Sequence, residues 1–237
     1  MMPKAIFCWS GGKDATYALH LTLLEQKFEV SYLLTTLNEE YKRVSMHGVR
    51  EELLDLQAQS IGLPLLKVFV NEGTNLEYEN KMKETLLLKK KEGITYIIFG
   101  DIFLEELREY REKSMSAIGI TCIFPLWKRN TNVILNKFIK AGFRSLLCCV
   151  NDGYLDETWL GRELDSKFSV QLPGEVDPCG ENGEYHTFCY DGPLFKNKIN
   201  FNLGEHIYKE LYVNTSENLG NMRGFWFIDL IPKNQTI

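Results

Sequence analysis

The sequence predicts an α/β protein with a five-stranded, parallel, doubly wound sheet and a second, smaller α+β domain. Two observations support this for the first half of the chain. Short apolar runs alternate there with helical patterns, and a glycine turn joins the first run to the first helical pattern. Such alternation is typical of a parallel sheet covered by helices on both faces. A third observation, the change of pattern after about Trp127, predicts the second domain.

The elements of the first sheet follow one another in regular order. Strands are expected at Lys4–Trp9, Val30–Leu37, Leu65–Val70, Tyr96–Gly100 and Thr121–Phe124. Helices are expected at Asp14–Gln26, Val49–Ile61, Tyr78–Glu92, Leu104–Ile118 and Thr131–Ala141. Glycines at 62, 93 and 142 mark helix ends, as glycine commonly does. Ligands of such sheets bind at the carboxyl ends of the strands, so we expect the site there.

The second half of the chain has few long helical periods. From Asn151 onward it is rich in glycine, acidic and aromatic residues. Further strands are expected at Arg144–Val150, Thr187–Tyr190, Leu194–Asn202, Ile207–Val213 and Gly224–Ile231. We therefore predict a first domain at residues 1–128 and a second at residues 129–237.

Composition and charge exclude several classes of protein. The 237 residues are 44% hydrophobic and 25% charged, as in ordinary globular proteins, and the net charge of −5 argues against an extended nucleic-acid surface. No apolar run approaches the ~20 residues of a membrane span, and the N-terminus lacks a signal-peptide pattern, which predicts a cytoplasmic protein. The six cysteines form no C-x-x-C pair and indicate reduced, mostly buried thiols. The oligomeric state stays open, and a homodimer is compatible with the sequence.

The first dense motif is Ser10-Gly11-Gly12-Lys13-Asp14, between the first expected strand and helix. Such a turn directs free backbone N–H groups and the positive end of the helix dipole at one point, which suits a phosphate. Lys13 adds a mobile positive charge, and Asp14 can cap the helix or help to hold Mg²⁺. The motif fits neither a Walker A loop nor the dinucleotide fingerprint. It predicts a phosphate site of another kind.

The second dense motif runs from Asp177 to Phe188 and reads D-P-C-G-E-N-G-E-Y-H-T-F. A solvated acidic turn is one interpretation of this composition. The flanking pairs Pro173-Gly174 and Gly192-Pro193 indicate a shaped loop instead. The motif also combines carboxylates with an imidazole, the groups that move protons near neutral pH.

The glycine turn resembles the PP-loop, S-G-G-x-D-S, of the N-type ATP pyrophosphatases, except that Ala15 replaces the last serine and removes one hydroxyl contact to phosphate. Together with the second motif it resembles the diphthine–ammonia ligase family. Supporting stretches are Met46–Arg50, Gly100-Asp101, Pro125–Trp127 and Leu155–Arg162. The resemblance implies a PP-loop ATP-binding domain followed by a substrate domain. It also implies an enzyme that uses ATP and Mg²⁺ to adenylate a carboxylate, releases pyrophosphate, and lets ammonia displace AMP to form an amide.

The resemblance assigns roles to individual residues. The phosphate cradle would comprise Ser10, Gly11, Gly12, Lys13, Asp14 and Ala15, with Asp14 as the metal ligand. His47 is either an adenosine contact or an exposed loop residue, and Gly100-Asp101 either contacts ribose or Mg²⁺ or caps a helix. Arg111 either faces the phosphates or lies on a solvated helix face.

Lys13 of the first motif is a candidate catalytic residue. In the second motif, Glu184 or His186 is the candidate base, and Glu181 would bind or orient ammonium. Asn182 and His186 replace a glycine and a glutamate of the diphthine branch, so the substrate is diphthine or another carboxylate.

Two other functions stay open at this point. A PP-loop enzyme that modifies RNA is one, but the acidic charge and the missing C-x-x-C count against it. A nucleotide sensor without enzymatic activity is the other, and such proteins lack both the Lys13-Asp14 pair and the acidic loop. Release of AMP and pyrophosphate would separate a ligase from a sensor.

Overall fold

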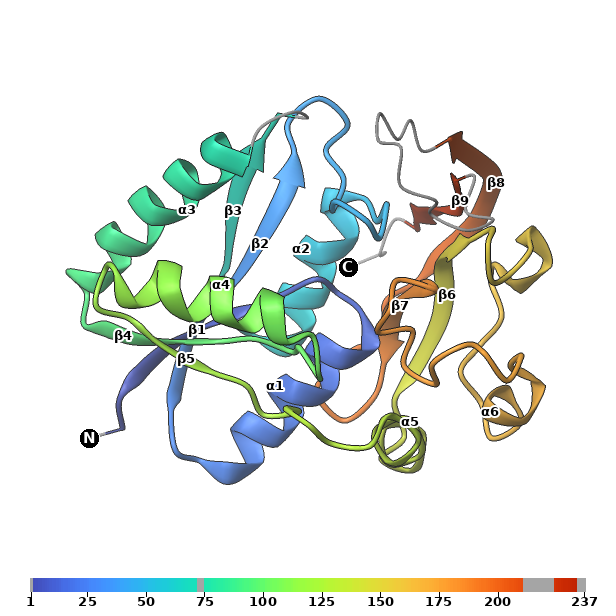
Figure 1. Ribbon diagram of the computed structural model, residues 1–237, viewed down its shortest axis with the longest axis horizontal. Helices are drawn as coiled ribbons and strands as arrows, with labels where there is room; N and C mark the ends of the chain where they lie inside the picture. Colours follow the sequence, from blue (N-terminus) through green and yellow to red (C-terminus); the bar gives the residue numbers. More distant parts are fainter. Residues whose placement is uncertain (1, 72–74, 211–223, 234–237) are drawn as a thin grey trace.

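The computed structural model describes residues 2–71, 75–210 and 224–233. Its larger sheet has five parallel strands, as the sequence predicted, and their order is β3-β2-β1-β4-β5 (Figure 1). These strands are β1 (Lys4–Cys8), β2 (Glu29–Asn38), β3 (Leu65–Val70), β4 (Ile94–Ile98) and β5 (Thr121–Ile123). The order reverses between β1 and β4, and a ligand crevice is expected outside the carboxyl ends of strands at such a point.

Helices cover both faces of this sheet. They are α1 (Lys13–Glu25), α2 (Glu51–Ile61), α3 (Asn75–Lys90) and α4 (Glu105–Ser116). Side chains alternate between the two faces of a strand. Accordingly, Phe7 of β1 packs in one cluster with α1 and α2, whereas Ile6 packs in another with α3 and α4. The doubly wound arrangement is therefore confirmed.

The second sheet has four antiparallel strands in the order β7-β6-β9-β8. They are β6 (Arg144–Asn151), β7 (Tyr185–Asp191), β8 (Phe201–Glu210) and β9 (Gly224–Pro232). The helices beside it are α5 (Thr131–Lys140), the short α6 (Phe168–Gln171) and the 3-10 helix η1 (Glu157–Trp159). A smaller α+β unit after the parallel sheet is thus confirmed.

One predicted strand, Leu194–Asn202, is wrong over most of its length. Residues 194–200 form turns and coil, and β8 begins only at Phe201. Phe195 N donates to Gly192 O, and the fully buried Ile199 donates its N–H to Tyr190 O. The apolar residues of this segment therefore anchor a connection instead of alternating along a strand. The strand predicted at Ile207–Val213 belongs to β8 as far as Glu210, and residues 211–213 lie outside the described part of the chain.

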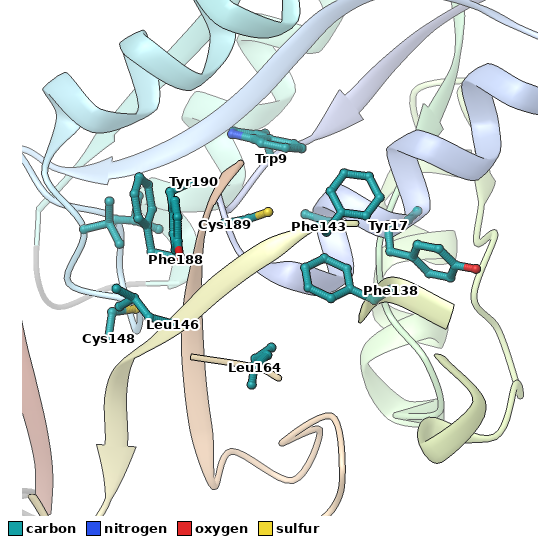
Figure 2. Packing of buried hydrophobic residues seen from close by; sticks show 14 of the residues in the cluster. Trp9, Tyr17, Phe138, Phe143, Leu146, Cys148, Leu164, Phe188, Cys189 and Tyr190 are labelled. Atoms are coloured by element: carbon teal, nitrogen blue, oxygen red, sulfur yellow. The ribbon is translucent and has the colours of Figure 1, made fainter. Parts of the chain in front are cut away.

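A single hydrophobic cluster joins the two sheets (Figure 2). Tyr17 of α1 contacts Phe138 of α5 with ring centroids 6.4 Å apart, and Phe138 stacks on Phe143 at 5.1 Å. Phe188 and Tyr190 of β7 belong to the same cluster. Helix α1 therefore packs on both sheets, and it begins at the glycine turn.

No disulfide joins the six cysteines, and four of them are buried, which confirms the prediction of mostly buried thiols. Within the described ranges, no helix has the length and apolar character that a membrane crossing requires.

Candidate active site

A cleft of about 740 Å³ lies at the carboxyl ends of β1, β2 and β4 and is closed on one side by the loop before β7. Most of the site residues predicted from the sequence line it: Ser10, Lys13, Asp14, Ala15, His47, Gly100, Asp101, Arg111, Glu181 and His186. Gly11, Gly12 and Glu184 are not among the lining residues. The cleft thus brings together the two dense motifs, which are more than 160 residues apart in the sequence.

Hydrogen bonds from α2 and β7 hold the glycine turn at Gly11. Gly11 has a φ of +80°, a region that favours glycine, and a Cβ there would lie 2.7 Å from Gln57 Oε1. Gly11 O accepts hydrogen bonds from Cys189 N at 2.9 Å and from Gln57 Nε2 at 3.0 Å. Trp9 Nε1 donates to Gln57 Oε1 at 2.9 Å. The buried Gln57, which sequence reasoning missed, therefore fixes the turn to α2 and β7.

Helix α1 begins at Lys13 directly after this turn. Gly12 is the N-cap residue and no side chain caps the helix, so the capping role considered for Asp14 is wrong. Gly12 N donates weakly to Ser10 Oγ at 3.3 Å, and Lys13 N donates to Thr187 Oγ1 at 3.0 Å. The start of α1 thus meets a hydroxyl that comes from the second sheet.

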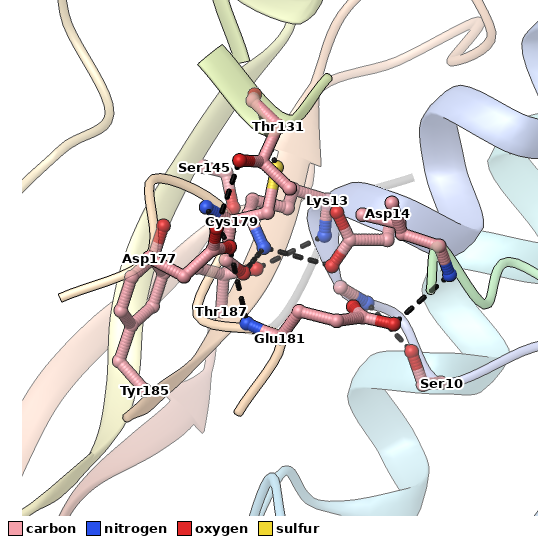
Figure 3. Close-up of polar contacts among 12 residues, drawn as sticks. Ser10, Lys13, Asp14, Thr131, Ser145, Asp177, Cys179, Glu181, Tyr185 and Thr187 are labelled. Carbon is pink, nitrogen blue, oxygen red and sulfur yellow. Dashed lines mark hydrogen bonds and ion pairs between the residues drawn. The ribbon is translucent and has the colours of Figure 1, made fainter. Parts of the chain in front are cut away.

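Lys13 and Asp14 form a buried ion pair at this helix start (Figure 3). Lys13 Nζ lies 2.7 Å from Asp14 Oδ2 and also donates to Cys179 O. Burial is the largest single influence and acts to lower the pKa of Lys13. The charge of Asp14, the neighbouring Tyr185 and Cys179 and the hydrogen bond to Asp14 together outweigh it and raise that pKa, so Lys13 stays protonated. Lys13 is only 3% exposed, so its charge is fixed in place and not mobile as expected.

Asp14 retains an unused oxygen. Its Oδ1 is buried without a hydrogen-bond partner among the described residues, and burial raises the pKa of this carboxyl against the opposing charge of Lys13. A buried polar atom without a partner costs free energy, so such an atom at a cleft wall suits a ligand.

Glu181 extends from the second motif to the first domain. Its Oε1 accepts a hydrogen bond from Ile102 N, after β4, at 2.9 Å. Burial, followed by the charge of Asp14, raises the pKa of Glu181 to about 7. A carboxyl with such a pKa exchanges protons efficiently near neutral pH. Glu181 is therefore suited to proton transfer as well as to the ammonium contact expected from the sequence.

Glu184 occupies a different position from the one expected for a base. It is fully buried and accepts hydrogen bonds from Asp177 N and Asn182 N, both at 2.9 Å, and from Asn182 Nδ2 at 3.0 Å. Asp177 Oδ1 in turn accepts from Cys179 N at 2.8 Å. These two carboxylates shape the loop from within, which leaves Glu181 as the loop carboxylate that lines the cleft.

His47 and His186 form a neutral pair in the cleft wall. Their ring centroids are 4.7 Å apart, and His47 Nδ1 lies 3.1 Å from Thr187 O. Because a carbonyl oxygen only accepts, His47 carries its proton on Nδ1. Burial lowers the pKa of His47 to about 4 and that of His186 well below its usual value. His186 Nε2 is buried without a partner among the described residues, so it can exchange a hydrogen bond with a ligand.

The loop that carries His47 is tied to the second sheet. Asp229 of β9 lies 2.7 Å from Arg50 and 2.8 Å from Arg43, and these two cations lower its pKa to about 2. Arg43 also donates to Gly48 O, next to His47. His47 is therefore a packed wall residue and not an exposed loop histidine.

The far wall of the cleft contains another ion pair. Arg111 Nε lies 2.7 Å from Asp101 Oδ2, and its guanidinium lies 4.2 Å from the ring centroid of Phe99. Arg111 is thus half-buried at the cleft and not on a solvated helix face. Asp101 does not cap α4, whose N-cap residue is Leu104.

Apolar side chains also line the cleft, among them Cys8, Leu34, Val70 and Phe99. Thr35 lines it too, and its Oγ1 is buried without a partner among the described residues. Apolar lining with a free hydroxyl suits a purine base. Sequence reasoning missed Thr35, although a threonine pair near the end of an apolar strand was a usable signal.

A glycine turn at the switch point of a doubly wound sheet, with a buried lysine and carboxylate beside it, defines a nucleotide-using enzyme of the PP-loop class. The sequence profile of the diphthamide synthase N-terminal domain matches residues 3–122, and that of the C-terminal domain matches residues 130–218. The chain belongs to the diphthamide synthase family and is an ATP-dependent ligase. The resemblance noted from the motifs is confirmed.

Named relatives agree with this assignment. The human diphthine–ammonia ligase is 28% identical over 213 residues, which cover 80% of this chain and 79% of that protein. The Schizosaccharomyces pombe enzyme of the same name is 26% identical over 216 residues, or 83% of this chain and 36% of that protein. Among solved structures, the U34-tRNA thiolase NcsA from Methanococcus maripaludis is similar at a TM-score of 0.38 and 15% identity, over 59% of this chain and 58% of its own. That likeness is too slight to bear on function.

Proposed function

We propose that this chain adenylates a substrate carboxylate with ATP, releases pyrophosphate, and forms an amide from the adenylate and ammonia. One observation supports this above the others. A fixed cation, Lys13, and a carboxyl group with a pKa of about 7, Glu181, line the same cleft. The cation suits the phosphates of ATP, and the carboxyl group suits the proton transfer that ammonia requires.

In the first step the substrate carboxylate attacks the α-phosphorus of ATP, and the bond to the β-phosphate breaks. Two anions must approach each other, so fixed positive charge lowers the barrier. Lys13 and the backbone amides at the start of α1 would hold the pyrophosphate as it leaves. The apolar side chains that line the cleft, together with Thr35, would hold the adenine.

The residues present fit a magnesium ion that also binds ATP. No group of three or more potential metal-binding side chains occurs in the part of the chain that the structure describes. Magnesium needs no such group, because it is commonly bound by one or two carboxylates together with substrate phosphates. Asp14 would supply its free Oδ1, and the ion would neutralise charge on the phosphates.

In the second step ammonia attacks the acyl carbon of the adenylate, and AMP leaves. Ammonium must first lose a proton, and Glu181 would accept it. His186 is a weaker candidate for this role than expected, because its pKa is lowered. Its free Nε2 would instead form a hydrogen bond with the substrate. Glu184, enclosed in its loop, would keep Glu181 in position.

The names of the relatives suggest diphthine as the carboxylate substrate. We propose that residues 1–128 form the ATP-binding domain and residues 129–237 the substrate domain. The neutral pair of His47 and His186 lines the cleft, and His186 belongs to β7 of the second sheet, so the pair would meet a substrate held by that sheet. Hydrogen bonding to neutral imidazoles would therefore contribute to the choice of carboxylate.

Isotope transfer tests the adenylation step directly. Diphthine with ¹⁸O in its carboxylate is incubated with the enzyme, ATP, Mg²⁺ and ammonium, and AMP is analysed by mass spectrometry. We expect one ¹⁸O atom in AMP, because the carboxylate oxygen stays on phosphorus when the amide forms. Unlabelled AMP, or ADP as the main product, would contradict the proposal. Turnover only with another carboxylate would retain the chemistry and reject diphthine.

A further inference from the structure

The first turn of α1 offers few side-chain hydroxyls to a phosphate. Ala15, which lines the cleft, has none. Thr16 donates its hydroxyl to Gly12 O at 2.8 Å, so this group is already used within the helix. Ser10 Oγ accepts from Gly12 N at 3.3 Å and can still donate its proton, so Ser10 is the one residue of the turn whose hydroxyl is open to a ligand in the cleft. At position 15 the helix start lacks the hydroxyl that the PP-loop pattern has there.

A hydroxyl from the second sheet lies beside that place. Thr187 of β7 is 2% exposed, lines the cleft, and accepts the hydrogen bond of Lys13 N at 3.0 Å (Figure 3). A hydroxyl that accepts one hydrogen bond can still donate another. The proton of Thr187 has no acceptor among the described residues, so it is available to a ligand.

We propose that Thr187 is a phosphate-binding residue of this enzyme and provides, from the second sheet, the hydroxyl that Ala15 lacks. This inference rests on the proposed function. Thr187 Oγ1 accepts from Lys13 N and donates its proton to an oxygen of the β- or γ-phosphate of ATP, the phosphates that leave as pyrophosphate. No covalent bond changes in this contact.

The surroundings of Thr187 favour this role. Its oxygen accepts from an amide at the positive end of α1, which polarises the hydroxyl and makes it a stronger donor. Its own carbonyl oxygen accepts from His47, so the backbone of β7 is held on the other side as well. Cys189 N, two residues along the strand, is bonded to Gly11 O. The hydroxyl is therefore held in position before ATP arrives.

Binding measurements with three ligands test the proposal. Calorimetric titrations of ATP, pyrophosphate and AMP, each with Mg²⁺, are compared for the wild type, Thr187→Val and Thr187→Ser. Loss of a hydrogen bond to a charged group predicts roughly 10- to 100-fold weaker binding of ATP and pyrophosphate to Thr187→Val. AMP should bind within about twofold of the wild type if the contact is to the departing phosphates. Thr187→Ser should bind all three ligands nearly as the wild type does.

Thr22→Val is the matched control. Thr22 is a buried threonine of helix α1, against which Thr187 packs, and its hydroxyl donates to Ala18 O at 2.8 Å, away from the cleft. The double variant Thr187→Val with Ala15→Ser should recover part of the lost affinity for ATP, because a hydroxyl returns to the same place from the helix side.

Three results would overturn the inference. Wild-type affinity of Thr187→Val for ATP would show that the hydroxyl does not bind phosphate. An equal loss of affinity for ATP and AMP would show that Thr187 only holds β7 against α1. Failure of the wild type itself to bind ATP would instead reject the proposed function on which the inference depends.

Discussion

The glycine turn before α1 and the acidic loop before β7 use their backbone amides in opposite ways. In the turn, Gly11 O accepts hydrogen bonds from Cys189 N and Gln57 Nε2. No side chain of α1 caps the amides at the start of that helix. The acidic loop uses its amides on its own carboxylates, since Asp177 and Glu184 both accept from them. We therefore expect the turn to bind an anion, whereas the carboxylates of the loop hold its own shape.

This difference explains why the number of carboxylates in the acidic loop overstates how many of them line the cleft. Its sequence offers three, but two are structural and only Glu181 lines the cleft. In the glycine turn, by contrast, Lys13 and Asp14 both reach the cleft. An acidic loop without helix or strand must satisfy its buried amides with side chains, and nearby carboxylates serve that need.

The largest effect is expected for Glu181→Gln, which removes the proton acceptor without a large change of shape. Amide formation should fall by about 10²- to 10⁴-fold. Because burial and Asp14 raise the pKa of Glu181 to about 7, the acid form dominates below that pH and cannot accept a proton. The wild-type rate at a constant, saturating concentration of ammonium should therefore rise with pH through about 7, and this limb should vanish in the variant. A retained limb would assign the base elsewhere.

The next effect is expected for Lys13→Ala in the turn. Loss of a fixed cation beside the phosphates should lower the rate of pyrophosphate release by about 100- to 1000-fold. A pyrophosphate assay measures the rate, and circular dichroism checks the fold. Lys27→Ala, a change in an exposed lysine just beyond the end of α1, is the matched control. Normal turnover of Lys13→Ala would remove the turn from the catalytic machinery.

Glu184→Gln separates the two kinds of carboxylate, because it is the same substitution as Glu181→Gln at a structural position. Weakening the hydrogen bonds to Asp177 N and Asn182 N should lower the free energy of unfolding by about 1–3 kcal/mol. Urea unfolding measures this loss. The limb near pH 7 should persist in the remaining activity, and its disappearance would make Glu184 a direct participant.

The smallest effect is expected for Asp229→Asn, which weakens the tie between the His47 loop and β9. Its ion pairs are partly solvated, so we expect a loss of stability of about 1 kcal/mol near neutral pH. Hydrogen bonds from Arg50, and from Arg43, lower the pKa of Asp229 to about 2 in the folded state, so its contribution is present above pH 4 and disappears as pH falls toward 2. Urea unfolding of both proteins between pH 3 and pH 7 checks this. A constant difference across the range would exclude the carboxylate charge as its cause.

The sequence predicted the features that depend on local patterns. The five parallel strands, their helices and the glycine turn each follow from a short run of residues, and all are present. The sequence also predicted Glu181 and His186 as site residues, because they lie within one dense motif, and both line the cleft. The strand predicted at Leu194–Asn202 is wrong because an apolar residue such as Ile199 can be buried in a connecting segment as well as in a strand. The sequence pattern is similar in both cases.

Contacts between residues that are far apart in the chain could not be predicted from the sequence. Gln57 lies 46 positions from Gly11, and Thr187 lies 174 positions from Lys13. Neither residue type signals such a partner, because buried amides and hydroxyls accept any nearby complement. The enclosure of Glu184 likewise depends on the three-dimensional path of its loop.

The bond from Cys189 N to Gly11 O has a consequence for local opening of the protein. The amide of Cys189 can exchange its hydrogen with solvent only when the glycine turn releases it, so we expect strand and turn to open together. A ligand that binds the closed form would stabilise both. If ATP binds at the turn as proposed, it should therefore slow hydrogen exchange in the middle of β7 as well as in the turn.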